Sequence, residues 1–158
     1  MSTLVRFLQF FSLGTWVGSI LFFSAILAPA AFTLFSSSQA GDLVSLTLGR
    51  LHLGGMVCGV VYLIATAAGA RSAAALVRPA PLLVLLMIVL TFLSQFWVSG
   101  NMAALRAQSS GPLEALPAGD ALRASFDRLH RLSVRLEVGV LLAGVVALLL
   151  TSRTPPAP

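Results

Sequence analysis

The sequence has very little charge. Asp, Glu, Lys and Arg together make up 9% of its 158 residues, whereas a soluble domain carries about 25%. Hydrophobic residues make up 58% of the chain and the mean hydropathy is +0.96. So few charges cannot cover the surface of a water-soluble globule of this size. The composition excludes a soluble enzyme, a nucleic-acid module and a disordered chain, and it predicts an integral membrane protein of one domain.

Lysine is absent and cysteine is nearly so. All ten basic residues are arginines, and they lie at the ends of apolar runs, where a guanidinium group reaches the lipid headgroups. The net charge of +5 therefore does not predict a nucleic-acid partner. The single Cys58 cannot form an internal disulfide. The chain also lacks a Ser-His-Asp order, HExxH, a phosphate-binding loop and CxxC, so no motif favours an enzyme.

Four apolar segments are each long enough to cross a bilayer, which takes about 20 helical residues. They predict helices over about 4–35, 43–70, 79–102 and 120–152. Together these form a single domain, residues 1–153, followed by a disordered tail at 154–158. Pro29 is expected to bend or end the first helix, and Asp120 is a good N-cap for the last. The first segment is too long for the core of a signal peptide.

The connections predict how the helices are arranged. The first two are short, which favours an all-α, up-down-up-down four-helix bundle with both termini on one side. The third, about 103–119, is the only one long enough for a lid or a surface helix. The terminal side carries arginines without acids. We expect a bacterial inner membrane with both termini cytoplasmic. The arginines of that side are Arg6, Arg71, Arg78 and Arg153.

Two glycine pairs offer close helix packing. Gly14 and Gly18 share one face of the first helix, and Gly55 and Gly59 share one face of the second. Small residues at this spacing let helix backbones approach in lipid. We expect packing within the molecule; a homo-oligomer or a membrane-protein partner is the alternative, and the bilayer itself is the partner in either case.

Polar residues inside the spans gather at one level. At 1.5 Å per residue from the arginines of the terminal side, His52, Gln95 and Glu137 lie about 24–28 Å along their helices. His130 and Asn101 lie about 34 Å along theirs. Ionisable residues within a membrane span are costly and therefore mark functional sites. The sequence predicts a polar site near the membrane face opposite the termini. The residues of this polar layer, apart from the two histidines, are Gln95, Asn101, Ser133 and Glu137.

The two histidines allow three interpretations. His52 and His130 lie on helices that are diagonal in an up-down bundle, as two axial ligands of haem b require, with Arg50 and Arg128 available for the propionates. A soft copper site would instead use His52, His130 and Met56. In the third interpretation both rings only make hydrogen bonds within the protein.

Glu137 leaves a further alternative open. A carboxyl group in hydrocarbon is neutral unless it is paired. Glu137 could be the proton carrier of a small solute or ion transporter, with Gln95 and Asn101 lining a path. Alternatively, it would have a structural role and pair with an arginine or with Gln95. A non-catalytic accessory subunit of a larger membrane complex is the remaining function class.

Two stretches resemble a known family. Trp16–Ser19 followed by Ala28–Phe32 is similar to the first helix of the transmembrane-protein-205-like family, and Phe126–Ser133 resembles the phenylalanine–histidine–serine motif that opens its last helix. Its bacterial members are catalogued as a domain of unknown function. The resemblance implies a four-helix membrane fold, and roles in transport or resistance are suggested for animal relatives. It covers most of the chain. The residues of this chain that match the pattern are Pro29, Phe32, His130 and Ser133, with His52 where some members carry histidine and Glu137 where an asparagine is usual.

Overall fold

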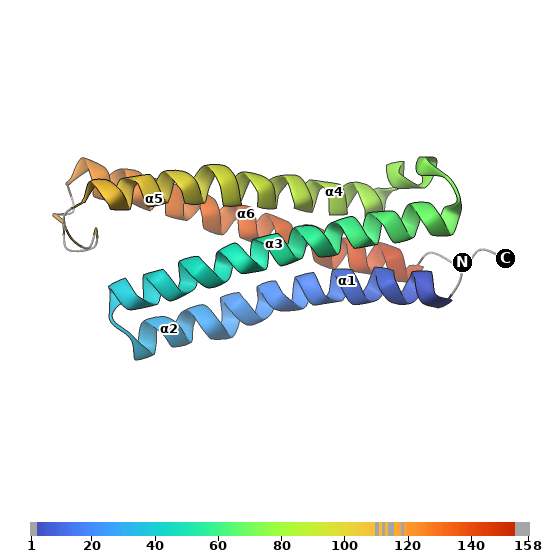
Figure 1. Cartoon of the computed structure of the whole chain (residues 1–158), viewed down its shortest axis with the longest axis horizontal. Helices are drawn as coiled ribbons and strands as arrows, with labels where there is room; N and C mark the ends of the chain where they lie inside the picture. The colour runs from blue at the N-terminus through green and yellow to red at the C-terminus, as the bar shows by residue number, and fades with distance from the viewer. Residues whose placement is uncertain (1–2, 110, 112, 114–115, 118, 154–158) are drawn as a thin grey trace.

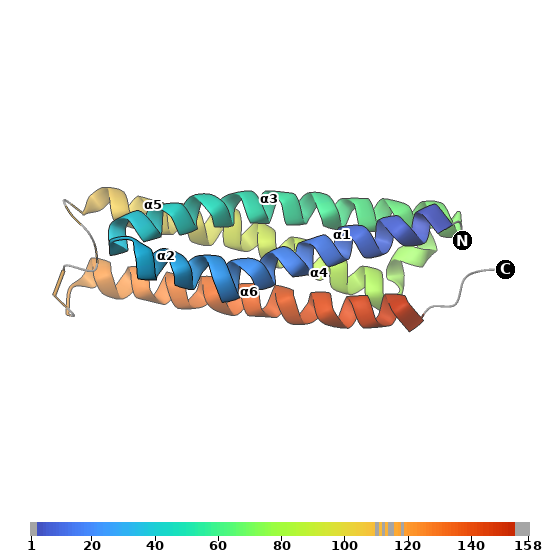
Figure 2. The same ribbon diagram turned by 90° about the horizontal axis from the view of Figure 1, so that it is seen from below.

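Four long helical rods run alternately up and down beside one another in the computed structural model, which describes residues 3–109, 111, 113, 116–117 and 119–153 (Figures 1 and 2). The described residues contain no strand. The first rod begins and the last rod ends at the same end of the molecule (Figure 1), which is called the terminal end below; the opposite end is the loop end. The predicted all-α, four-helix architecture is confirmed.

Two of the rods contain a π-helical stretch. The 3-10 helix η2, Ala73–Val77, connects the second rod to the third. In chain order the rods are α1 (Thr3–Phe22), η1 (Phe23–Leu27) and α2 (Ala28–Leu34); α3 (Ser37–Ala70); α4 (Pro79–Phe92), η3 (Leu93–Val98) and α5 (Ser99–Gln108); and α6 (Ala121–Arg153). The π-helices are η1 and η3.

The helix boundaries follow local capping. Asp120 caps α6 as predicted, since its Oδ1 accepts from the backbone N–H groups of Leu122 at 2.8 Å and Arg123 at 3.3 Å. The second rod begins at Ser37 rather than near residue 43, because the Ser36 hydroxyl accepts from the Gln39 N–H at 3.4 Å and caps the helix six residues earlier. The third rod continues to Gln108 instead of ending near residue 102, which shortens the third connection. The tail expected at 154–158 lies outside the described residues.

Pro29 does not end the first helix, and that alternative was wrong. The helix continues through Pro29 to Leu34. Immediately before it, the N–H of Ala28 donates to the carbonyl of Phe23, five residues back, so the backbone is widened into a π turn. A proline ring collides with the carbonyl four residues back in a regular α-helix. The wider turn is the local adjustment that accommodates it.

The apolar core fills the half of the bundle near the terminal end. There α1 packs against α3 and α6, and α4 packs against the same two helices, so the four rods close into a ring. Trp16 is 1% exposed and lies across Gly55 and Gly59, where any added Cβ would overlap its indole ring. This glycine pair therefore packs within the molecule. No side chain or neighbouring backbone would lie within 4 Å of a Cβ at Gly14 or Gly18.

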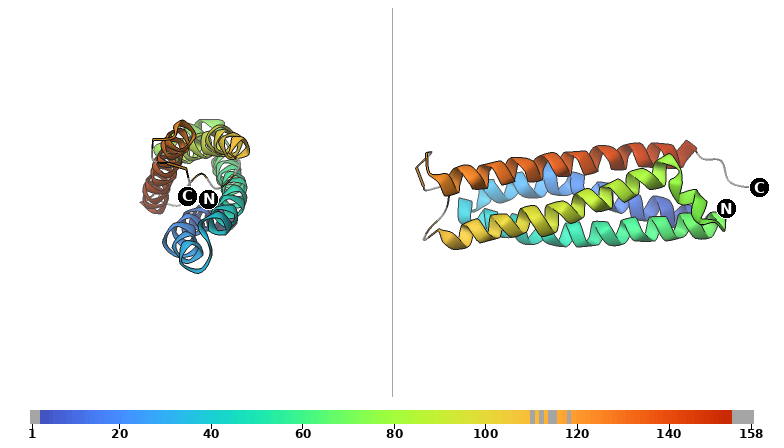
Figure 3. Two further views of the ribbon diagram at one scale, coloured as in Figure 1. Left: turned by 90° about the vertical axis from the view of Figure 1, so that its left-hand side faces the viewer. Right: turned by 90° about the horizontal axis from the view of Figure 1, so that it is seen from above.

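The two helix pairs diverge towards the loop end. Beyond the π turns, α2 packs mainly on α3, and α5 packs mainly on α6 and its own rod. Figure 1 shows these pairs separating, and the end-on view in Figure 3 shows the rods arranged around an arc. The outer faces carry large apolar side chains along all four rods. Because such a surface is stable only in hydrocarbon, it indicates a lipid bilayer environment. Examples are Phe7, Phe22, Leu53, Val89 and Leu142.

Replacing Gly55 by alanine should destabilise the protein by about 1–3 kcal/mol, the usual cost of overpacking a core, because the new methyl group overlaps Trp16. The neighbouring Gly54→Ala is the matched control. Nothing lies within 4 Å of a Cβ there, and alanine favours a helix over glycine by up to about 1 kcal/mol. Unfolding of both purified variants in one detergent measures the difference. Equal stabilities would contradict the packing described for Trp16.

Candidate functional site

A histidine is fully buried between three of the rods. His52 of α3 is 0% exposed. Its Nδ1 lies 2.9 Å from Oε1 of Gln95 in η3, and its Nε2 lies 3.1 Å from Oε2 of Glu137 in α6. The side chain of Glu137 is 12% exposed. These three residues are called the His52 cluster below. The structure thus brings together three polar residues that the sequence places at one depth.

The cluster lies near the middle of the bundle, level with both π-helices. Gln95 itself belongs to η3. The hydrogen bond from Gln9 to Thr66 marks the register of α1 on α3. His52 lies fourteen residues before Thr66 in α3, and fourteen residues after Gln9 in the antiparallel rod is Phe23, the first residue of η1. π turns inside α-helices occur frequently at functional sites. Here two of them flank the buried polar cluster.

The hydrogen bonds assign a proton within the cluster. The carbonyl oxygen of Gln95 only accepts, so Nδ1 of His52 carries a hydrogen and donates it. The remaining contact joins Nε2 to a carboxyl oxygen of Glu137. One proton between these two atoms makes either a neutral imidazole beside a carboxylic acid or an imidazolium beside a carboxylate. Both forms have no net charge, and each keeps the hydrogen bond.

Several polar atoms near the cluster lack a partner. In the described part of the chain, four buried side-chain atoms make no hydrogen bond: Nε1 of Trp16, Oγ1 of Thr91, Oγ of Ser94 and Oε1 of Glu137. Trp16 packs on Gly55, one turn along α3 from His52, and Thr91 is one turn before Gln95. Burying an unpaired polar group costs about 1–3 kcal/mol. These atoms are hydrogen-bonding groups beside the cluster that the described part of the protein leaves without a partner.

Two other residues of the predicted polar layer lie apart from the cluster. Ser133 is buried on α6, one turn from Glu137 towards the loop end. Asn101 is exposed, and its amide donates to the backbone carbonyl of Trp97 at 2.6 Å. Asn101 therefore makes no contact with His52 and does not extend the cluster.

The structure does not bring the two histidines together. His130 is exposed on α6 and stacks on Phe126, with ring centroids 6.5 Å apart. It lies seven residues beyond Glu137 towards the loop end, a rise of about 10 Å. Both ring nitrogens of His52 are already bonded inside the protein, so neither is free for a metal in this arrangement.

The other predicted ligands also lie apart. Arg50 and Arg128 are exposed, and Met56 is half-buried four residues after His52. Among the residues that the structure describes, no group of three or more His, Cys, Asp and Glu is arranged to hold a metal ion.

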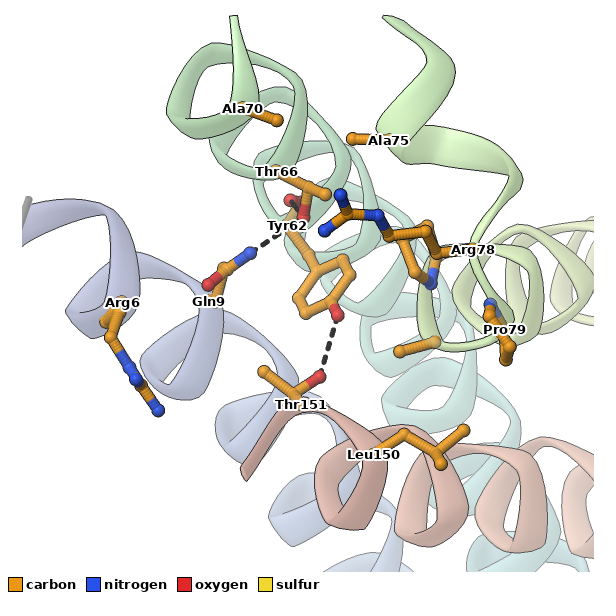
Figure 4. A pocket seen from close by; sticks show the side chains of 12 residues that line it. Arg6, Gln9, Tyr62, Thr66, Ala70, Ala75, Arg78, Pro79, Leu150 and Thr151 are labelled. Carbon is orange, nitrogen blue, oxygen red and sulfur yellow. Dashed lines mark hydrogen bonds between the residues drawn. The ribbon is translucent and has the colours of Figure 1, made fainter. Parts of the chain in front are cut away.

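The terminal end holds a second polar region that the sequence analysis missed. Gln9 donates to Thr66 at 2.9 Å, and the Tyr62 hydroxyl lies 2.7 Å from that of Thr151 (Figure 4). Tyr62 and Thr66 are one turn apart near the end of α3. Polar residues near the end of a span are common, so only the register between helices shows that they converge.

Comparison with known families gives one match. A family model described as a domain of unknown function, DUF4149, matches residues 11–110, more than half of the chain. This stretch includes Trp16, His52 and Gln95 but ends before α6, which carries Glu137. No curated protein and no solved structure matches the chain.

His52→Ala should destabilise the protein by about 1–3 kcal/mol, because it leaves Gln95 and the buried carboxyl of Glu137 without their partner. His130→Ala is the matched control and should stay within about 0.5 kcal/mol of the parent, since that ring is on the surface. Unfolding of the purified proteins in detergent measures both. A larger loss of stability for His130→Ala than for His52→Ala would show that the His52 cluster does not stabilise the fold as described.

Proposed function

The chain belongs to the DUF4149 family, and on that premise we propose that it is a small proton-coupled transporter in which the His52–Glu137 pair carries the proton. The observation behind this proposal is the 3.1 Å contact between Nε2 of His52 and Oε2 of Glu137 inside a membrane-spanning bundle. Ionisable groups within a bilayer are rare and typically mark ion paths and proton relays.

The pair is suited to taking up a proton. With one shared proton the pair has no net charge. A second proton makes an imidazolium beside a carboxylic acid, and the unpartnered Oε1 of Glu137 is the atom that can receive it. Gln95 holds Nδ1 of the ring in its donor form. The exchangeable proton is therefore confined to the side of the ring that faces Glu137.

In this proposal the proton reaches the cluster from the loop end. The exposed Arg50 and Arg135 lie two residues from His52 and Glu137, respectively. Arginine side chains extend to the headgroup region, so the loop-side membrane boundary is close to the cluster. Towards the terminal end the apolar core and Trp16 close the bundle. Release of the proton to the terminal side then requires the Trp16 side chain to move away from Gly55 and Gly59, against which it packs.

The coupled solute is small and polar in this proposal. Trp16, Thr91 and Ser94 have unpartnered hydrogen-bonding atoms within a turn of the cluster. A solute that bonds these atoms would recover part of the cost of their burial. Its binding would thereby depend on whether the neighbouring pair holds one proton or two.

Other predictions from the sequence stay open. They are haem b or copper on His52 and His130, an accessory-subunit role, kinship with the transmembrane-protein-205-like family, and an inner-membrane location with cytoplasmic termini. The proton carrier is preferred because its two groups are in contact, whereas the two histidines lie on different parts of the molecule.

Proton movement should depend on Glu137. In liposomes containing the purified protein and an internal pH dye, a membrane potential should drive uncoupled proton entry through the pair in the absence of solute. Glu137→Gln should reduce this entry to the rate of protein-free liposomes, because an amide cannot release a proton. Asp127→Asn is the matched control, since Asp127 is an exposed acid on the same helix, and it should leave the rate unchanged. Proton entry that survives Glu137→Gln would overturn the proposal.

The carboxyl group itself can be observed. Infrared difference spectra taken across a pH titration should contain the C=O stretch of a buried carboxylic acid, and Glu137→Gln should remove it. If no such band changes with pH, Glu137 does not exchange a proton and the carrier mechanism fails.

An absorption spectrum checks the haem prediction. A Soret band in the purified protein that disappears in both His52→Ala and His130→Ala would support paired axial ligands. That result would also contradict the proton-carrier proposal, because both nitrogens of His52 cannot then keep their bonds to Gln95 and Glu137.

A further inference from the structure

A pocket opens among all four rods at the terminal end (Figure 4). Its volume is about 210 Å³, far more than the ~10–15 Å³ that one water molecule requires. Its polar side chains come from α1, α3 and α6 and from the residue before α4. They are Arg6, Gln9, Tyr62, Thr66, Arg78 and Thr151. The pocket is separate from the His52 cluster, because Tyr62 lies ten residues, or about 15 Å, along α3 from His52.

The pocket wall is held in place by a directed chain of hydrogen bonds. Thr151 donates to the carbonyl of Ala147 at 2.7 Å, so the Tyr62 hydroxyl donates to Thr151 at 2.7 Å. Thr66 likewise donates to the carbonyl of Tyr62 at 2.8 Å and accepts from Gln9 at 2.9 Å. The hydroxyl protons are therefore already used. What the wall still offers a ligand is the second amide hydrogen of Gln9 and the guanidinium groups.

The charge around the pocket has one sign. Arg78 extends towards Tyr62 and Thr66 (Figure 4), and Arg6 lines the pocket from α1, with its guanidinium carbon 5.9 Å from the Phe10 ring centroid. No acid is present to neutralise them, because the sequence has none in 1–41, 43–113 or 138–158. A bound anion would therefore meet uncompensated positive charge.

The beginning of α4 adds to this field. Pro79, Ala80 and Pro81 form the first turn of α4 and line the pocket. The positive end of the helix dipole thus points at the pocket. Ala80, between two prolines, has a backbone N–H at a position without an intrahelical acceptor. Helix N-termini with free N–H groups bind phosphate and other anions.

We propose that this terminal pocket binds a phosphate group. Arg78 provides the main charge, Arg6 at the rim adds to the positive field, and Gln9 and the start of α4 provide neutral donors. The phosphate belongs either to the headgroup of an anionic lipid or to a small soluble phosphate ester. Both sources present the same chemistry to the pocket, and arginine recognises phosphate through paired N–H donors.

Two measurements separate the sources. Native mass spectrometry of the purified full chain, incubated with phosphatidylglycerol or with phosphatidylcholine, detects a retained lipid. Calorimetric titration of delipidated protein in detergent with glycerol 3-phosphate detects a soluble ester. Retention of phosphatidylglycerol over phosphatidylcholine identifies the lipid source, and saturable binding of glycerol 3-phosphate identifies the soluble source. Either result supports the phosphate site.

The variants test which residues bind. Arg78→Gln should weaken the observed binding at least about tenfold, since a hydrogen bond to a charged group contributes roughly 1.5–3 kcal/mol, and adding Arg6→Gln should weaken it further. Arg71→Gln is the matched control, because Arg71 is exposed at the same end but does not line the pocket. It should bind like the parent.

Three outcomes would overturn the proposal: no binding of either ligand, equal retention of the two lipids with no binding of the ester, or equal loss in Arg71→Gln and Arg78→Gln. Arg71 and Arg78 are exposed and Arg6 is half-buried, and circular dichroism verifies that each variant is folded. Proton entry through the His52 cluster is measured separately, so failure of this site leaves the transport proposal intact.

Discussion

The free-energy cost of placing an ionisable side chain in hydrocarbon determines how the side chains pack at the centre of this molecule. In water, His52 and Glu137 would each form hydrogen bonds with the solvent. Inside the bundle they form a hydrogen bond with each other instead. Gln95 completes the arrangement by accepting from the other ring nitrogen. Three rods must keep their relative register for these bonds to persist. The cluster is therefore both a constraint on packing and the place where a proton can be held without net charge.

Helix packing divides the bundle into two unlike halves. Near the terminal end, glycines on α3 admit the indole of Trp16, and the four rods close into a ring around an apolar core. Towards the loop end the rods associate mainly in pairs. The His52 cluster lies where these halves meet, level with the two π turns. The cluster therefore lies at the boundary between the closely packed half and the half in which the rods pair.

The terminal end has a different chemistry. Its arginines have no acidic neighbours, the Tyr62 hydroxyl is bonded to Thr151, and the Thr66 hydroxyl donates to the backbone carbonyl of Tyr62. The apolar core separates this end from the His52 cluster by about 15 Å along α3. The proposed proton site and the proposed anion site therefore use different residues, on opposite sides of the apolar core.

Composition and periodicity were sufficient to predict the four spans, the Asp120 cap and the common depth of His52, Gln95 and Glu137. Each depends on local rules of length, capping and helical rise. The continuation of the helix past Pro29 was decided by a π turn that no local propensity indicates. Asn101 and His130 lie six and seven residues from Gln95 and Glu137 towards the loop end, on exposed faces. Their exposure could not be predicted, because the rotation of a helix about its axis is set by its neighbours. For the same reason the pocket beside Tyr62 required the tertiary structure: residues distant in sequence converge there only through the packing of all four rods.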